Sequence, residues 1–180
     1  MKIVCFGDSN TWGFDPRGPY SGRYAQPWPD ILARKLCCTV VNQGENGREI
    51  PKCGVSFPED TDVLIVMLGT NDLLQFWPAE AACEKMKNFL KSLMLPQEKI
   101  LLVGPPPMTF GEWVLDQELI DDSQSLNRFY ERLAEELGAH FTDTGLWNIP
   151  LAYDGVHLTE EAQTLFADQL AEYIVKEFQI

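Results

Sequence analysis

The chain of 180 residues lacks the cysteine pattern of a disulfide framework or a zinc site. Its five cysteines are an odd number, Cys37 and Cys38 are adjacent, and no C-x-x-C pair occurs. Disulfide scaffolds and zinc ribbons instead pair their cysteines at characteristic spacings. We therefore expect reduced, mostly buried thiols and no bound metal.

Long hydrophobic runs are also missing. The N-terminal stretch, residues 1–6, is apolar for only a few positions before Gly7 and Asp8, which is too short for the core of a secretion signal. No run approaches the roughly 20 apolar residues of a membrane-spanning helix. These absences predict a cytoplasmic protein that does not enter a membrane.

Positive charge is scarce. The chain has 14 Lys and Arg against 27 Asp and Glu, a net charge of -13, and its basic residues are scattered. Such a surface repels the phosphates of nucleic acids and of anionic lipids. We expect neither nucleic acid nor a membrane as a partner, and the composition leaves the oligomeric state open.

Three common catalytic signatures do not occur: G-x-S-x-G, H-E-x-x-H and the P-loop. Their absence disfavours a standard α/β-hydrolase, a zinc metalloprotease and a P-loop NTPase. The chain does have the composition of a globular protein, with 45% apolar and 23% charged residues. Its length suits one domain, residues 1–180.

Short apolar runs alternate with longer helical stretches. Strands are expected at residues 2–6, 39–42, 62–68, 99–103 and 139–142. Helices are expected at residues 28–37, from Pro78 to about 95, from about 121 to 137 with Gly138 as C-cap, and from an N-cap at Thr159 almost to the end. This order predicts an α/β fold, a three-layer α/β/α sandwich with a central parallel sheet of about five strands, flavodoxin-like in arrangement.

Polar turns follow the expected strands. They are residues 7–11, 43–47 and 69–72, and residues 154–157 before the last helix. Each could be an ordinary turn, because Gly, Asn, Asp and Ser are the usual turn residues. Folds of this kind, however, place their sites at the carboxyl ends of the strands. Four such turns at one edge of a sheet favour a functional site.

A serine, a histidine and an aspartate in these turns suit acyl transfer. His157 follows Asp154 by three residues, so the carboxylate can orient the imidazole while the other ring nitrogen acts as a base. Ser9 lies at a strand-to-helix turn that would expose its hydroxyl, although a helix-capping serine is the plain alternative. The second histidine, His140, lies in an expected strand, and we expect it to be structural.

Taken in order, the turns resemble the signature blocks of the SGNH hydrolase superfamily, also called GDSL-like esterases and lipases. The matching stretches are FGDSNTWG at 6–13, NQGENG at 42–47, LGTND at 68–72 and DGVHL at 154–158. Residues 7–13 and 104–107 are similar to those of the bacterial arylesterase and acyltransferase-like subgroup. Asn10 stands where the family's name has leucine.

The resemblance implies an esterase that needs no cofactor and no metal. It implies Ser9 as the nucleophile, with Asp154 and His157 completing the triad. The Ser9 amide, a glycine amide of the second block and the Asn71 side chain would form the oxyanion hole. Spacing from Asn42 favours Gly47 as that glycine, with Gly44 as the alternative.

The expected substrate is a small soluble ester with a short acyl group. A sugar O-deacetylase, a thioesterase or lysophospholipase and an acyltransferase would use the same residues. Two non-enzymatic alternatives are a flavodoxin-like binding module and a degenerate SGNH domain that binds without turnover. Trp12, Trp77 and above all Trp113 are candidates for lining the pocket. Asp8 and Asp72 are expected to hold their turns through nearby backbone amides.

Overall fold

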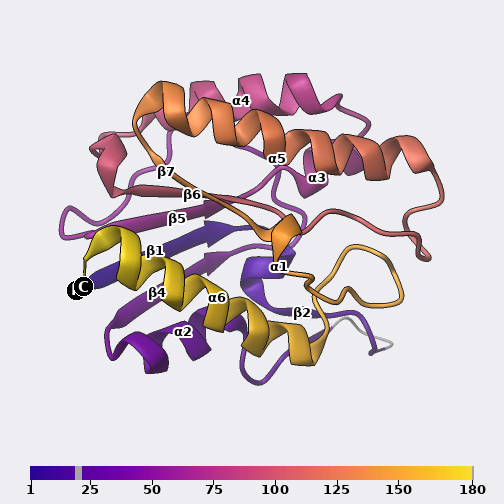
Figure 1. The fold of residues 1–180 in the computed structure, drawn as a ribbon, viewed down its shortest axis with the longest axis horizontal. Helices are drawn as coiled ribbons and strands as arrows, with labels where there is room; N and C mark the ends of the chain where they lie inside the picture. The colour runs from indigo at the N-terminus through magenta and orange to yellow at the C-terminus, as the bar shows by residue number, and fades with distance from the viewer. Residues whose placement is uncertain (19–21, 180) are drawn as a thin grey trace.

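The computed structural model describes residues 1–18 and 22–179, and its elements form three layers (Figure 1). The middle layer is a five-stranded parallel sheet in the order β4-β1-β5-β6-β7. Its strands are β1 (Lys2–Gly7), β4 (Thr39–Gly44), β5 (Val63–Met67), β6 (Ile100–Gly104) and β7 (His140–Asp143). The predicted three-layer α/β/α sandwich is confirmed.

The longer helices cover both faces of this sheet (Figure 1). On one face lie α2 (Trp28–Leu36) and α6 (Glu160–Phe178), and on the other lie α4 (Ala79–Ser92) and α5 (Gln117–Leu137). Val4 and Leu64 point toward α4 and α5, whereas their neighbours Ile3 and Ile65 point toward α2 and α6. Because all four are buried, the strands have continuous apolar sequences without alternation.

The predicted helix caps are present, while two helix ends differ from the prediction. Thr159 Oγ1 accepts a hydrogen bond from the Ala162 amide at 3.2 Å, and Gly138 closes α5 with a φ of 73°. The start of α5, at Gln117, precedes the predicted residue 121, because the polar residues 121–125 separate Leu119 and Ile120 from the apolar spacing that begins at Leu126. Helix α4 ends at Ser92, before the predicted residue 95.

Several short elements escaped the sequence analysis, since they span too few residues to show a period. They are α1 (Ser9–Trp12), β2 (Phe14–Asp15), β3 (Gly22–Arg23), α3 (Thr70–Leu74) and the 3₁₀ turns η1 (Gln97–Lys99) and η2 (Thr144–Leu146). Helices α1 and α3 begin just after β1 and β5. They therefore set the direction of the side chains at one edge of the sheet.

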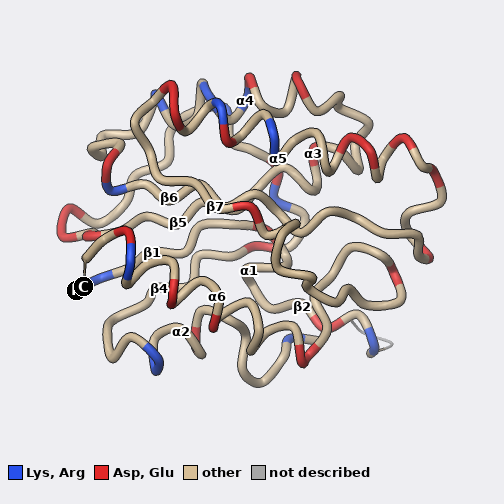
Figure 2. The backbone as a smooth tube through the Cα atoms, in the orientation of Figure 1, with Lys and Arg blue, Asp and Glu red and all other residues tan. Residues whose placement is uncertain are grey.

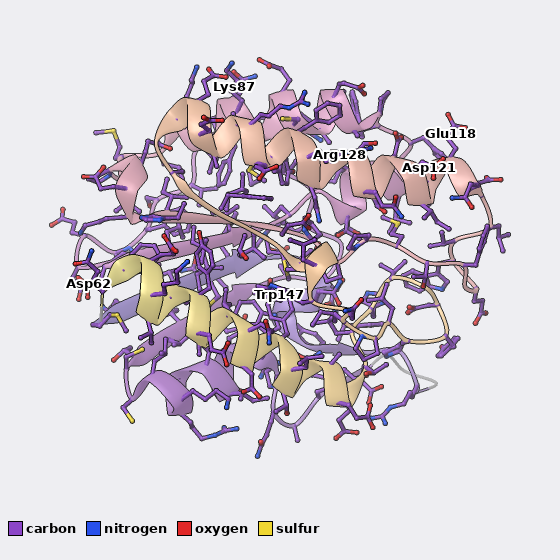
Figure 3. The ribbon with its side chains drawn as sticks, in the orientation of Figure 1. Asp62, Lys87, Glu118, Asp121, Arg128 and Trp147 are labelled. Atoms are coloured by element: carbon purple, nitrogen blue, oxygen red, sulfur yellow. The ribbon has the colours of Figure 1, made fainter. Side chains whose placement is uncertain are left out.

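Charged residues lie mainly on the outer helices and the loops, and few lie in the strands of the sheet between them (Figure 2). Glu118, Asp121 and Arg128 lie on the exposed face of α5 (Figure 3). Between the two helices of that layer, Lys87 Nζ donates to Glu136 at 2.9 Å. None of the described helices is long and apolar enough to cross a membrane.

The cysteines are free, but the expectation that most are buried is wrong. Cys5 in β1 is buried, whereas Cys37 and Cys53 are exposed. Cys37 ends α2 in a left-handed conformation, with a φ of 49°.

Candidate active site

The predicted turns meet at the carboxyl edge of the sheet and enclose one small cavity. Its volume is about 150 Å³. The lining residues are Ser9, Phe14, Asn46, Gly47, Asn71, Leu74, Trp113, Val156 and His157. These residues come from segments far apart in the sequence, and parallel pairing of β4, β1 and β5 brings their turns together.

Ser9, His157 and Asp154 form a continuous hydrogen-bonded chain at this cavity. Ser9 Oγ lies 2.9 Å from His157 Nε2, and His157 Nδ1 lies 2.6 Å from Asp154 Oδ2. The carboxylate accepts a hydrogen bond from the N–H at Nδ1. The neutral imidazole then has its lone pair on Nε2, which accepts a hydrogen bond from the serine hydroxyl. Both His157 and Asp154 are buried.

Asp154 is held by the loop that carries it. Its Oδ1 accepts hydrogen bonds from the amides of Val156 at 2.9 Å and His157 at 3.0 Å. Burial by itself would raise the pKa of Asp154, but the hydrogen bonds from the His157 ring and these two amides outweigh burial and lower the pKa. The carboxylate is therefore ionised and fixed in direction.

Asn10 joins the serine turn to the histidine loop. Its Oδ1 accepts from the Leu158 amide at 2.9 Å, and its Nδ2 donates to the Val156 carbonyl at 3.1 Å. The Trp28 indole donates to the Asn10 carbonyl at 3.0 Å. The sequence analysis missed this role, because nothing local to Asn10 points to a partner 148 positions away.

A second loop clamps the histidine loop through its backbone. The Thr109 amide donates to the Gly155 carbonyl at 3.0 Å, and the Trp113 amide donates to the Asp154 carbonyl at 3.1 Å. Gly155 has a φ of +80°, and a Cβ there would lie 2.1 Å from the Thr109 carbonyl oxygen. Glycine at this position is therefore required for the two loops to approach.

Two aromatic rings flank the imidazole. Trp113 meets His157 edge-on, with ring centroids 5.2 Å apart, and Phe14 of β2 lies at 4.4 Å on a tilted plane. The expectation that Trp113 lines the pocket agrees with this placement. Phe14 was missed, since it belongs to a two-residue strand without a recognisable pattern.

The other two tryptophans are placed differently. Trp12 is not among the described residues that line the cavity, so its assignment to the pocket is wrong. Its ring centre lies 5.7 Å from the Arg23 guanidinium carbon. Trp77 lies outside the cavity as well, with Lys85 Nζ 4.9 Å from its ring centre.

The three residues predicted to donate to an oxyanion all line the cavity. Ser9 is the first residue of α1, where an amide has no acceptor within the helix. Gly47 has a φ of 74° and lines the cavity, and no described residue accepts a hydrogen bond from its amide. Asn71 Nδ2 donates one of its two N–H groups to the Arg48 carbonyl at 3.0 Å, which leaves the second N–H for the cavity.

Gly44 has another role. Its amide donates to Asn42 Oδ1 at 2.8 Å, and a Cβ there would lie 2.1 Å from the Trp12 amide nitrogen. Gly44 thus allows α1 to pack against β4. Of the two glycines left open by the sequence, the geometry favours Gly47 as the oxyanion donor.

The two remaining carboxylates differ from each other. Asp8 Oδ1 accepts from the Asn10 amide at 2.9 Å, as expected, and burial raises the pKa of Asp8 to about 6. Asp72 does not hold its own turn, contrary to expectation. It accepts from the distant Ile50 amide at 3.0 Å and pairs with Lys85, and burial raises its pKa against the opposing effect of that lysine.

His140 lies in β7, with its ring 4.3 Å from that of Phe178, and takes no part in the cavity. In the part of the chain that the structure describes, no group of three or more His, Cys, Asp and Glu side chains is arranged to hold a metal ion.

Comparison with known proteins agrees with this geometry. The model of the GDSL-like lipase/acylhydrolase family matches residues 5–165. A bovine protein named isoamyl acetate-hydrolyzing esterase 1 homolog is 26% identical, over 97% of this chain and 82% of its own length. The human protein of the same name is 24% identical, with the same coverage of both chains.

Solved structures show the same fold. A carbohydrate acetylesterase family member from Sinorhizobium meliloti has a TM-score of 0.84 at 26% identity and covers 100% of both chains. An aryl esterase of M. smegmatis, at 24% identity, also has a TM-score of 0.84 and covers 98% of this chain and 99% of its own. The chain therefore belongs to the GDSL-like lipase/acylhydrolase family, within the SGNH hydrolases, and is a carboxylic ester hydrolase.

Proposed function

We propose that the protein is a serine esterase that hydrolyses small carboxylic esters with a short acyl group through an acyl-enzyme on Ser9. The observation that carries the proposal is the hydrogen-bonded chain Ser9–His157–Asp154, which opens on a cavity of about 150 Å³. A nucleophile, a base, a group that orients the base and a space for the ester meet there, as acyl transfer requires.

In the first half of the reaction, Ser9 Oγ attacks the ester carbonyl carbon while His157 Nε2 takes the hydroxyl proton. Asp154 stabilises the imidazolium that forms. The developing oxyanion accepts hydrogen bonds from the amides of Ser9 and Gly47 and from Asn71 Nδ2. Collapse of the tetrahedral intermediate breaks the bond to the alcohol oxygen, which leaves with the proton from His157.

The second half repeats these steps with water. His157, neutral again, takes a proton from water as the water oxygen attacks the acyl carbon. The same donors hold the second oxyanion. Its collapse breaks the bond to Ser9 Oγ, which regains the proton, and the carboxylic acid leaves. An alcohol in place of water would complete an acyl transfer, by the same proton movements.

The size of the cavity supports a short acyl group. A volume of about 150 Å³ is below the roughly 300–1,000 Å³ of typical small-molecule pockets. Leu74 and Asn46 line the cavity together with the oxyanion donors. Two of the relatives named above have names that refer to acetate esters, isoamyl acetate-hydrolyzing esterase 1 homolog and carbohydrate acetylesterase family member.

The nature of the alcohol follows from the surroundings of His157. The departing alcohol must lie beside the imidazole that protonates it, and Phe14 and Trp113 flank that ring. We expect the alcohol to pack on these rings. Deacetylation of a sugar is the second candidate, because a sugar ring also stacks on aromatic faces and one structural relative is a carbohydrate acetylesterase family member.

The test is hydrolysis of p-nitrophenyl acetate, butyrate and octanoate by the wild type, Ser9→Ala and Ser92→Ala, the last a matched control on the remote helix α4. We expect Ser9→Ala to lower kcat by about 10³-fold or more, Ser92→Ala to be unchanged, and activity to decline with acyl length. Equal turnover by Ser9→Ala and wild type would refute the proposal. Isoamyl acetate and acetylated xylose then distinguish the two alcohols.

A further inference from the structure

Arg48 directly follows Gly47 and contacts all three segments that carry the oxyanion donors. We propose that Arg48 is a positioning residue, whose guanidinium and carbonyl together fix the oxyanion hole. This inference rests on the proposed function, because it concerns how the same site stabilises the same intermediate.

The guanidinium joins the ends of two neighbouring strands. Arg48 Nη1 donates to the Gly7 carbonyl at 2.9 Å and also to the Gln43 carbonyl. Gly7 ends β1 and lies two residues before Ser9, while Gln43 lies near the end of β4. The Gly7 carbonyl also accepts from the Glu45 amide at 3.1 Å. The start of the Gly47 turn is thereby tied to the strand that leads to the nucleophile.

The guanidinium is held in place on its remaining sides. Its carbon lies 4.2 Å from the centre of the Phe6 ring, and Nη2 donates to Glu45 Oε2 at 2.6 Å. Only 18% of the Arg48 side chain is exposed. The planar guanidinium, with several donors, suits this arrangement of two carbonyls, one carboxylate and one ring face. A lysine ammonium could make only some of these contacts.

The main chain of Arg48 fixes the other donors. Its amide donates to the Glu45 carbonyl at 3.2 Å, which closes the turn around Gly47. Its carbonyl accepts from Asn71 Nδ2 at 3.0 Å, which sets the plane of that side-chain amide and directs the second N–H. A shift of Arg48 would therefore move Gly47 and Asn71 together.

Direct binding of the substrate by Arg48 does not fit these contacts. Arg48 is not among the described residues that line the cavity, and three of the five N–H groups of its guanidinium donate to Gly7, Gln43 and Glu45. Its effect must act through the oxyanion donors. Because the oxyanion exists only in the intermediate and the transition state, loss of this support should lower kcat and leave KM nearly unchanged.

The experiment measures kcat and KM for p-nitrophenyl acetate in Arg48→Met and Arg48→Lys, with Arg34→Met as the control. Arg34 is an exposed arginine of α2, remote from the site. We expect Arg48→Met to lower kcat by about 10- to 100-fold with KM within about threefold, a partial loss of one or more oxyanion donors. Arg48→Lys should recover part of that loss, and Arg34→Met should match the wild type.

A double-mutant cycle with Asn71→Ala separates positioning from general destabilisation. If Arg48 acts through Asn71, Arg48→Met should lower kcat far less in the Asn71→Ala protein than in the wild type. An equal fold-loss in both proteins would overturn the inference. Should Arg48→Met not fold, Arg48→Lys takes its place in the same cycle.

The two proposals fail in different ways. A wild type whose turnover depends on Ser9, together with full kcat in both Arg48 variants, overturns the role of Arg48 and leaves the esterase intact. Turnover that does not depend on Ser9 overturns the proposed function and, with it, the oxyanion hole on which Arg48 acts.

Discussion

The two halves of the candidate site are built in opposite ways. On the side of the proposed triad, Ser9, His157 and Asp154 are joined by hydrogen bonds, and the Asp154 carboxylate also accepts hydrogen bonds from two backbone amides. On the side of the proposed oxyanion hole, Gly47 and Asn71 line the cavity, and Asn71 has a second side-chain N–H beside the one bonded to Arg48. The base must be oriented before substrate arrives, whereas the oxyanion donors need a partner that forms only during the reaction.

The supports of the two halves differ as well. Asn10 and the Thr109–Gly155 backbone contact hold the triad loop through neutral hydrogen bonds. Charged side chains support the oxyanion side. Arg48 donates to the carbonyl at the end of β1, and Lys85 forms an ion pair with Asp72, the residue after Asn71.

Replacing the carboxylate that orients the base should have the largest effect. Asp154→Asn keeps the size of the side chain but can donate to His157 Nδ1, which would place the imidazole proton on Nε2, the atom that must accept from Ser9. We expect kcat to fall by about 10³- to 10⁴-fold. Steady-state kinetics with p-nitrophenyl acetate measure this, and a loss below tenfold would show that Asp154 does not orient the base.

Removing one oxyanion donor should have a smaller effect. Asn71→Ala is expected to lower kcat by about 10²- to 10³-fold with little change in KM. In the Ser9→Ala background the same substitution should change the residual rate little, because no serine-bound oxyanion forms. Equal fold-losses in the two backgrounds would contradict the assigned role.

The smallest effect concerns stability at the junction of the halves. Burial raises the pKa of Asp8 from 3.8 to about 6, so the folded state binds more protons than the unfolded state between these pH values. The free energy of unfolding therefore falls as the pH rises from about 4 to about 6. Above about pH 6 Asp8 is ionised in both states, and its contribution stays at this lower value. Asp8→Asn retains the acceptor for Asn10 without the charge.

We expect Asp8→Asn to be more stable than the wild type at pH 8, by up to about 3 kcal/mol, and similar to it at pH 4. Urea unfolding at both pH values measures the difference. A variant that is less stable than the wild type at pH 8 would show that the Asp8 carboxylate stabilises the fold in its charged form.

The sequence predicted the sheet and the meeting of Ser9, His157 and Asn71, because strand ends in a parallel sheet face one edge. It did not predict the links across that edge. Asn10 and Arg48 bond to groups distant in the chain, and their sequence neighbourhoods contain no sign of those partners. Trp12 was misplaced because the direction of a side chain depends on α1, a helix of four residues without a detectable period.

Covalent labelling of the serine tests the central claim most directly. Diethyl p-nitrophenyl phosphate should transfer one diethylphosphoryl group to Ser9 Oγ with release of p-nitrophenolate, and mass spectrometry of the peptides would locate it. We expect complete labelling at Ser9 in step with loss of esterase activity, and much slower labelling in Asp154→Asn. Full inactivation with the adduct on another residue, or with Ser9 unmodified, would contradict the account.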